Sequence, residues 1–197
     1  MPINCTEIDA LVTRASEALQ TIQNQLGIKN VPEARVRFPR GFIRSAAAHR
    51  NSLPNLGSEI QRRNASYALM SLDVFRWLVV RTDVSGAALS MIVKEGICVF
   101  GALCEWLTKE ASRGHASGRP FCQRTTKLVK LDHIKPNLKI ELDWVWEIRC
   151  NEHLHEVLSL EHELYSRDNY NRAQKAYFGL RDALVKKHGS VATPTSQ

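Results

Sequence analysis

The chain has 197 residues and a mass of 22.3 kDa, which favours one domain. Hydrophobic residues make up 44% and charged residues 24%, so wholesale disorder and collagen-like repeats are excluded. Lysine and arginine number 27 against 20 acidic residues, and the resulting net charge of +7 favours an anionic partner.

The chain lacks the signals of membrane insertion and secretion. No run of about 18 consecutive apolar residues is present, and no basic region followed by an apolar stretch begins the sequence. The five cysteines are widely spaced and odd in number, so disulfide frameworks and cysteine-rich zinc sites are disfavoured. We therefore expect a cytoplasmic protein with reduced thiols, no membrane partner, and Cys98 and Cys104 in its core.

The first half of the chain predicts two long helices. Apolar residues recur at three- and four-residue steps over 6–26, which indicates an amphipathic helix that Gly27 ends. A second helix is predicted over 58–81, where Ser58 and Gln61 fit a capping box.

The stretch 87–111 is hydrophobic nearly all round, so we expect this third helix at the centre of a bundle. Gly96 and Gly101 lower its helix propensity but allow neighbouring helices to approach closely. A fourth helical region is predicted over 138–164, with a break near Asn151.

A fifth helix is predicted to begin at a cap formed by Asn169 or Asn171. The small, polar tail at 190–197 is expected to be disordered. The predicted fold class is all-α, a four- to five-helix bundle with two long basic loops. Residues 1–57 are expected to form an N-terminal helix and basic loop, and residues 58–189 the bundle.

Two segments hold the excess positive charge. The segment 29–50 has six cations and one acidic residue, and 113–139 has seven cations and one acidic residue. Glycine and proline in both favour loops. Such loops form an electrostatic footprint for the phosphate backbone of RNA, or else a solvated surface that keeps the protein soluble. The RNA-binding candidates in them are Arg35, Arg37, Arg40, Arg124, Lys127 and Lys130.

The common signatures of phosphate-binding loops, dinucleotide-binding folds, serine hydrolases and H-E-x-x-H metalloproteases are absent. The densest polar cluster lies at 144–156, where Arg149, Asn151, His153 and His155 interrupt an apolar helix. On a straight helix Arg149 and His153 share one face, and Asn151 and His155 share another.

These residue types fit the cleavage of RNA without a metal. A neutral histidine takes the proton from a ribose 2′-hydroxyl or protonates the leaving oxygen. An arginine holds the phosphate and offsets the charge that grows in the transition state, while an asparagine orients the phosphate or the imidazole. The structural alternative is that Arg149 pairs with Glu152 or Glu156 and the histidines simply cover the bundle surface.

This polar cluster, following two long helices in an all-α chain, resembles the HEPN superfamily. The mark of that family is an arginine, usually followed by a polar residue, then four to six residues and a histidine. By this resemblance Arg149 is the arginine of the motif and His155 is its histidine, with five residues between them. Cys150 takes the place that Asn, Asp or His usually holds, Asn151 comes one place later, and His153 is a rival for the histidine role.

The resemblance implies a homodimeric, metal-independent endoribonuclease of a bacterial defence or toxin–antitoxin system, with one composite site at the dimer seam. We therefore expect RNA, a second copy of the chain and an antitoxin or defence-system protein as partners, and no cofactor or metal. The alternative is a non-catalytic helical module that binds a protein or nucleic-acid partner. A further alternative is a metal-dependent hydrolase that uses the histidines and glutamates of 152–163. The expected catalytic residues are Arg149, His155, His153 and Asn151.

Overall fold

The computed structural model describes residues 5–150 and 165–189, and every regular element within those ranges is helical. The all-α class is thereby confirmed. The described residues contain seven α-helices rather than four or five, because α2 (Ala46–Asn51) and α5 (Phe121–Lys130) lie inside segments that we expected to be loops. The tail at 190–197 lies outside the described residues.

The chain divides into two compact units, of which the first is Met1–Pro39. This unit contains α1 (Cys5–Leu26) and a 3₁₀ turn, η1 (Pro32–Ala34). Gly27 ends α1 in the left-handed backbone region, with a φ of 57°, and its N–H donates to the carbonyl of Gln23 over 2.8 Å. The predicted helix and its stop signal are confirmed, and no residue of α1 is buried.

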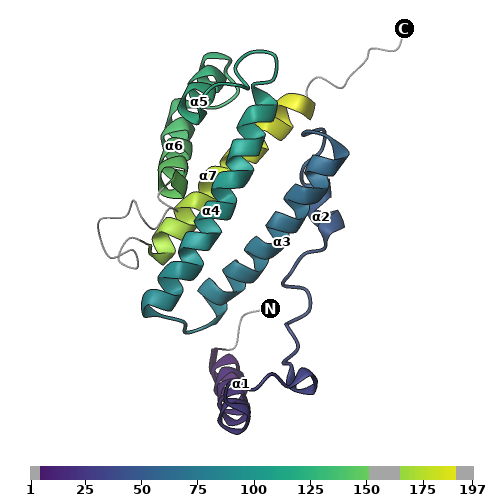
Figure 1. Ribbon diagram of the computed structural model, residues 1–197, viewed down its shortest axis with the longest axis vertical. Coiled ribbons are helices and arrows are strands. Elements are labelled where there is room, and N and C mark those ends of the chain that lie inside the picture. The colour runs from purple at the N-terminus through teal and green to yellow at the C-terminus, as the bar shows by residue number, and fades with distance from the viewer. Residues whose placement is uncertain (1–4, 151–164, 190–197) are drawn as a thin grey trace. The chain divides into compact units, whose positions relative to one another are not determined.

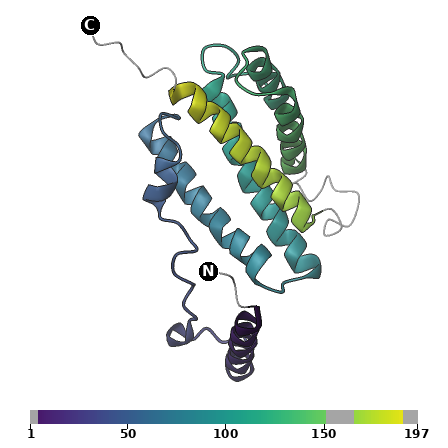
Figure 2. The same cartoon turned by 180° about the vertical axis from the view of Figure 1, so that it is seen from behind.

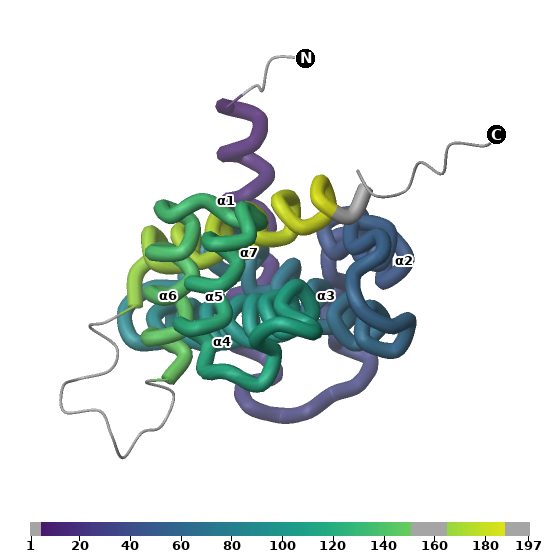
Figure 3. Tube along the Cα trace, turned by 90° about the horizontal axis from the view of Figure 1, so that it is seen from above, coloured from purple at the N-terminus to yellow at the C-terminus, as the bar shows by residue number. Residues whose placement is uncertain are grey.

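The second unit, Arg40–Gln197, is built around α4 (Gly86–Ala111). This helix packs against α3 (Glu59–Arg81), α6 (Pro136–Cys150) and α7 (Arg167–Gly189), and also against α5. Figure 1 shows α3 on one side of α4 and the α5–α6 pair on the other. Figure 2 shows α7 lying along α4 from behind, and Figure 3 looks down on the same arrangement. The helix expected at the centre of the bundle is therefore found there.

Close packing of the bundle depends on a glycine of α4. A Cβ atom built at Gly96 would lie 2.6 Å from the ring of Tyr170 on α7, so only glycine fits this contact. The Tyr170 hydroxyl donates to the carbonyl of Leu72 on α3 over 3.2 Å. Its ring meets that of Phe100 edge-on, with 5.6 Å between centroids. One buried tyrosine thus joins three helices.

Two helix starts carry reciprocal caps. Ser58 and Gln61 exchange the two hydrogen bonds of the predicted capping box at the start of α3. The cap of α7 differs from the prediction, because Ser166 takes that place. Asn169 stands at the third helical position, where its side chain accepts from the Ser166 N–H and its own N–H donates to the Ser166 hydroxyl. Neither Asn169 nor Asn171 is the cap residue.

The two basic segments are only partly loops. All but the last residue of helix α2 lies in 29–50, and α5 with the first turn of α6 lies in 113–139. Helix α5 forms because Phe121, Thr125 and Leu128, at four- and three-residue steps, are buried against the bundle. Lysines and arginines between these positions obscured the helical pattern in the sequence.

Residues 40–57 belong to the second unit, because α2 packs against α3. Asp73 on α3 anchors this segment: it accepts hydrogen bonds from the Arg44 backbone over 2.9 Å, from the Arg44 guanidinium over 2.7 Å and from Nε2 of the buried His49 over 3.0 Å. Burial acts to raise the pKa of Asp73, but these partners hold the pKa below its ordinary value. Burial lowers the pKa of His49, so the neutral imidazole acts as the donor.

Helix α4 is the one helix within residues 5–150 and 165–189 that is long and apolar enough to span a membrane. The most apolar stretch of 18 residues in α4 has a mean hydropathy of 1.7, and 56% of that stretch is buried inside the bundle. A core helix of a globular domain has the same length and composition. The cysteines Cys98 and Cys104 on this helix are buried as expected, and none of the five cysteines forms a disulfide.

Candidate functional site

Arg149 lies in the last turn of α6, with 29% of its side chain exposed. Its Nη2 atom is 3.3 Å from Oε2 of Glu105 on α4, and its guanidinium carbon is 4.8 Å from the centre of the Trp146 ring. A Cβ atom built at Gly101 would lie 2.8 Å from Cδ of Arg149, so the missing side chain makes room for the arginine stem. A carboxylate, an aromatic ring and a glycine therefore fix the position of this arginine.

Glu105 is shared by several cations. Nζ of Lys109 lies 2.8 Å from its Oε1, closer than Arg149 lies to Oε2. Burial acts to raise the pKa of Glu105, but Lys109, Arg149 and Arg124 together hold the pKa below its ordinary value. Lys109 and Arg149 pair with Glu105 directly, and Arg124 acts on it at longer range. We call Glu105, Lys109, Arg124 and Arg149 the Glu105 cluster; its net charge of +2 favours an anion nearby.

A row of four side chains connects Arg149 to α5. The rings of Trp146 and Phe121 are stacked, with centroids 4.7 Å apart and planes 3° from parallel. The guanidinium of Arg124 lies 5.5 Å from the centre of the Phe121 ring, on α5. The α5 surface and Arg149 are therefore held together by direct contacts.

Arg124, one of the RNA-binding candidates, is buried in the structure. This side chain is 4% exposed, and its Nη1 donates to the carbonyl of Arg119 over 2.5 Å while its Nε faces the Thr108 hydroxyl at 3.4 Å. Burial lowers the pKa of its guanidinium, although Glu105 acts to raise it. Arg124 anchors the loop before α5 and is closed to an RNA ligand. The other basic candidates are exposed or partly exposed: Arg35, Arg37, Arg40, Lys127 and Lys130.

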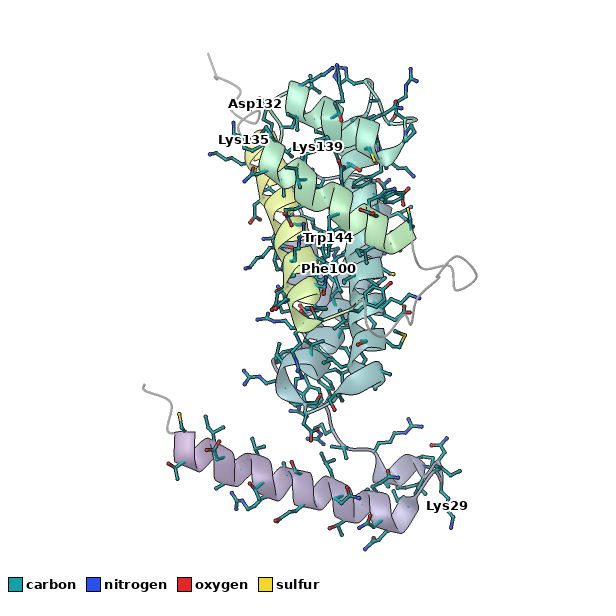
Figure 4. The ribbon with its side chains drawn as sticks, turned by 90° about the vertical axis from the view of Figure 1, so that its left-hand side faces the viewer. Lys29, Phe100, Asp132, Lys135, Lys139 and Trp144 are labelled. Atoms are coloured by element: carbon teal, nitrogen blue, oxygen red, sulfur yellow. The ribbon has the colours of Figure 1, made fainter. Side chains whose placement is uncertain are left out.

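The loop at 112–120 and α5 form a basic surface. Between Glu110 and Asp132 the chain has five cations and no acidic residue. Near the turn between α5 and α6, Lys135 pairs with Asp132 over 2.8 Å. Figure 4 labels both residues. Within the described part of the chain, no acidic side chain pairs with Lys127 or Lys130, so their charges are available to a phosphate backbone.

The other expected catalytic residues, Asn151, His153 and His155, lie outside the described residues, as do the acidic residues that the structural alternative paired with Arg149. Glu105 was not expected as a partner of Arg149, although an acidic residue in an apolar helix indicates a counter-charge. No group of three or more potential metal ligands occurs within 5–150 and 165–189.

Comparisons of the chain with family models, with curated proteins and with solved structures give no match. The resemblance to the HEPN superfamily therefore depends on Arg149, the polar residues that follow it and the helical context.

Replacing Gly101 with alanine should lower the free energy of unfolding by about 1–3 kcal/mol, because the new methyl group would collide with the Arg149 stem. The higher helix propensity of alanine would by itself stabilise the protein by about 1 kcal/mol. The sign of the change in unfolding free energy therefore shows whether the clash with Arg149 outweighs it. Urea denaturation followed by circular dichroism measures it. Gly118→Ala is the control, because an added Cβ there meets nothing within 4 Å. A more stable Gly101→Ala protein would contradict the close contact with Arg149.

Proposed function

We propose that this protein is a HEPN-like, metal-independent endoribonuclease of a bacterial defence or toxin–antitoxin system. The observation that supports this most is the state of Arg149: partly exposed, fixed from three sides and part of a cluster with net charge +2. A phosphate needs a guanidinium that is preorganised and accessible, and Arg149 keeps 29% of its side chain exposed although Glu105 lies against it. A side chain sealed in an internal ion pair would have lacked both exposure and excess positive charge.

In this proposal RNA is cleaved by its own 2′-hydroxyl. One histidine, His155 or His153, takes the 2′-hydroxyl proton as the 2′-oxygen bonds to phosphorus and the bond from phosphorus to the 5′-oxygen breaks. A protonated histidine gives a proton to the departing 5′-oxygen. Arg149 stabilises the phosphorane charge, and Asn151 orients the reacting groups. The products are a 2′,3′-cyclic phosphate and a 5′-hydroxyl, and two protomers contribute to one site.

In this proposal the α5 surface binds the RNA strand and does not take part in the chemical step. Lys127 and Lys130 lie on the helix that the row of stacked side chains connects to Arg149. Cations that contact phosphates raise affinity and fix the register of the strand, without reading sequence. RNA held along α5 would therefore be guided toward the end of α6.

A non-catalytic module that binds nucleic acid is the second candidate, and the ion pair between Arg149 and Glu105 favours it. An arginine that lies against a carboxylate and packs its stem on a glycine is typical of a structural contact between helices. In that case Arg149 holds α6 to α4, and RNA binds α5 without being cut.

Incubating the full-length protein with mixed RNA in excess chelator tests the proposal. We expect fragments with 2′,3′-cyclic phosphate and 5′-hydroxyl ends, and no cleavage of DNA of the same sequence, which lacks the nucleophile. RNA that is retarded in a gel but intact would overturn the nuclease and support the binding module. Cleavage that appears only after a divalent metal is restored would instead support a metal-dependent hydrolase.

A further inference from the structure

A cavity of about 580 Å³ lies where the turn between α5 and α6 meets the second half of α7. Pockets that bind small molecules commonly have volumes of about 300–1,000 Å³. The described residues that line it all belong to Arg40–Gln197, so the walls of the cavity do not depend on where Met1–Pro39 lies. Its wall includes Asn137 in the first turn of α6, whereas Arg149 lies in the last turn, about 18 Å away along the helix axis. The cavity is therefore separate from the Glu105 cluster.

The floor of this cavity is apolar. On α7, Gly179 and Ala183 stand four residues apart and so share one face of the helix. Ile134, which is 3% exposed, and Leu138 line the cavity with them. A Cβ atom built at Gly179 would lie 3.1 Å from Cδ1 of Leu138, so α6 and α7 already touch along this edge. The space beside that contact exists because both α7 residues are small, and it fits a hydrocarbon body.

The charged groups around the cavity are mostly positive. Its lining includes Lys135, Lys186, Lys187 and Asp132. Three lysines against one aspartate leave a net charge of +2 when His133 is neutral. Lys135 pairs with Asp132, but within residues 5–150 and 165–189 no acidic side chain pairs with Lys186. The cavity thus favours an anionic group above its apolar floor.

Asp132 shows that the cations around the cavity act on one place. It ends α5 in the left-handed backbone region, with a φ of 52°, a position that glycine usually takes. The N–H of the next residue, His133, donates to the carbonyl of Leu128 over 2.9 Å and closes this turn. Lys135 first, and then Lys187 and His133, hold the pKa of Asp132 below its ordinary value. A carboxylate beside the cavity is therefore already stabilised by groups that line it.

We infer that this cavity binds a small organic anion that combines an apolar body with one carboxylate. The apolar body packs on Ile134, Leu138 and Ala183, and the carboxylate meets the lysines of the rim. An inorganic anion lacks the body that fills the floor, and an amphiphilic cation is repelled by the net charge of +2. This ligand site goes beyond the proposed cleavage of RNA and does not depend on it.

Titration calorimetry of the full-length protein with octanoate tests this inference. We expect one octanoate to bind per chain. Acetate, which keeps the carboxylate but lacks the chain, should bind at least about 100-fold more weakly. Octylamine, which keeps the chain but carries the opposite charge, should bind at least about 10-fold more weakly than octanoate. Absence of octanoate binding, or equal binding of octanoate and octylamine, would overturn the proposal.

Two substitutions of charged residues should change the affinity for octanoate in opposite directions. Lys186→Glu reverses a charge at the rim and should weaken binding by about 10-fold, whereas Asp132→Asn removes the competing carboxylate and should strengthen binding by about 3-fold. Asparagine adopts the left-handed region readily, so the turn is kept. The matched control is Lys175→Glu, the same change on α7 about 16 Å away along the axis and outside the lining of this cavity. It should bind octanoate almost as the unaltered protein does.

A third variant tests the apolar floor. Ala183→Leu fills part of the cavity and should weaken octanoate binding by at least about 10-fold. Circular dichroism shows whether this variant folds; if it does not, the two substitutions of charged residues still decide the question. Equal affinity in Lys186→Glu and Lys175→Glu would place octanoate elsewhere and overturn the proposal. RNA cleavage is measured separately, so the ligand site can fail while the nuclease stands, and the reverse.

Discussion

Replacing Arg149 with alanine should lower the rate of RNA cleavage by at least about 100-fold, while the helical circular dichroism stays the same. The loss follows from removing a preorganised positive charge at the phosphate in the transition state. Lysine at this position keeps the charge but loses the planar, two-pronged guanidinium and its contact with Trp146, so we expect it to recover only part of the rate. The measurement is the initial rate on a labelled RNA in excess chelator.

The chain offers a matched control for this substitution. Arg172 on α7 also combines an ion pair, to Glu141 over 2.6 Å, with a ring contact, 4.0 Å from the centre of the Trp144 ring. Figure 4 labels Trp144 among the side chains of the bundle. Arg172→Ala removes the same kind of structural contact without touching the Glu105 cluster, and it should leave cleavage nearly unchanged. Full activity of Arg149→Ala, or equal losses in both variants, would remove Arg149 from the chemistry.

Replacing Asp73 with alanine should lower the free energy of unfolding of the second unit by about 2–3 kcal/mol. The carboxylate has 4% of its surface exposed and accepts hydrogen bonds from both Arg44 and His49. Its removal leaves the buried His49 N–H unpaired and a guanidinium without its counter-charge. Urea denaturation followed by circular dichroism measures the change.

Asp182→Ala is the control for that experiment. Asp182 also pairs with an arginine, Arg181, over 2.6 Å, but 64% of its side chain is exposed. Because water screens such a pair, its loss should change stability by no more than about 1 kcal/mol. A comparable small effect at Asp73 would show that residues 40–57 are held to the bundle by other contacts.

The long helices were predictable because each carries several independent signals. The apolar spacing of α1, the capping box of α3 and the continuous hydrophobicity of α4 agree with the structure to within a residue or two. Helices α2 and α5 were missed because they have six and ten residues, and isolated helices of this length are marginal without tertiary contacts. Their stability comes from side chains such as His49 and Phe121 that contact other parts of the chain.

The candidate site was predictable only in part. Arg149 was identified from its local sequence, but its partner Glu105 lies on another helix, and sequence spacing carries no information about that contact. Arg124 was assigned to the surface because it is charged. The structure buries it: the backbone carbonyl of Arg119 and the charge of Glu105 offset part of the cost, while the buried Nη2 atom has no hydrogen-bond partner in the described part of the chain.

The sharing of one carboxylate among three cations creates a conflict between holding the molecule together and binding a ligand. Glu105 draws Lys109 and Arg149 toward α4, and an incoming phosphate must compete with it for the same guanidinium. A neutral residue in place of Glu105 would leave the neighbouring cations to repel one another. It would also leave the guanidinium of Arg149 free to bind anions without competition. Under the proposed function, a phosphate must displace Glu105 from Arg149, so we expect weak anions to bind poorly and an RNA strand that also contacts α5 to bind well.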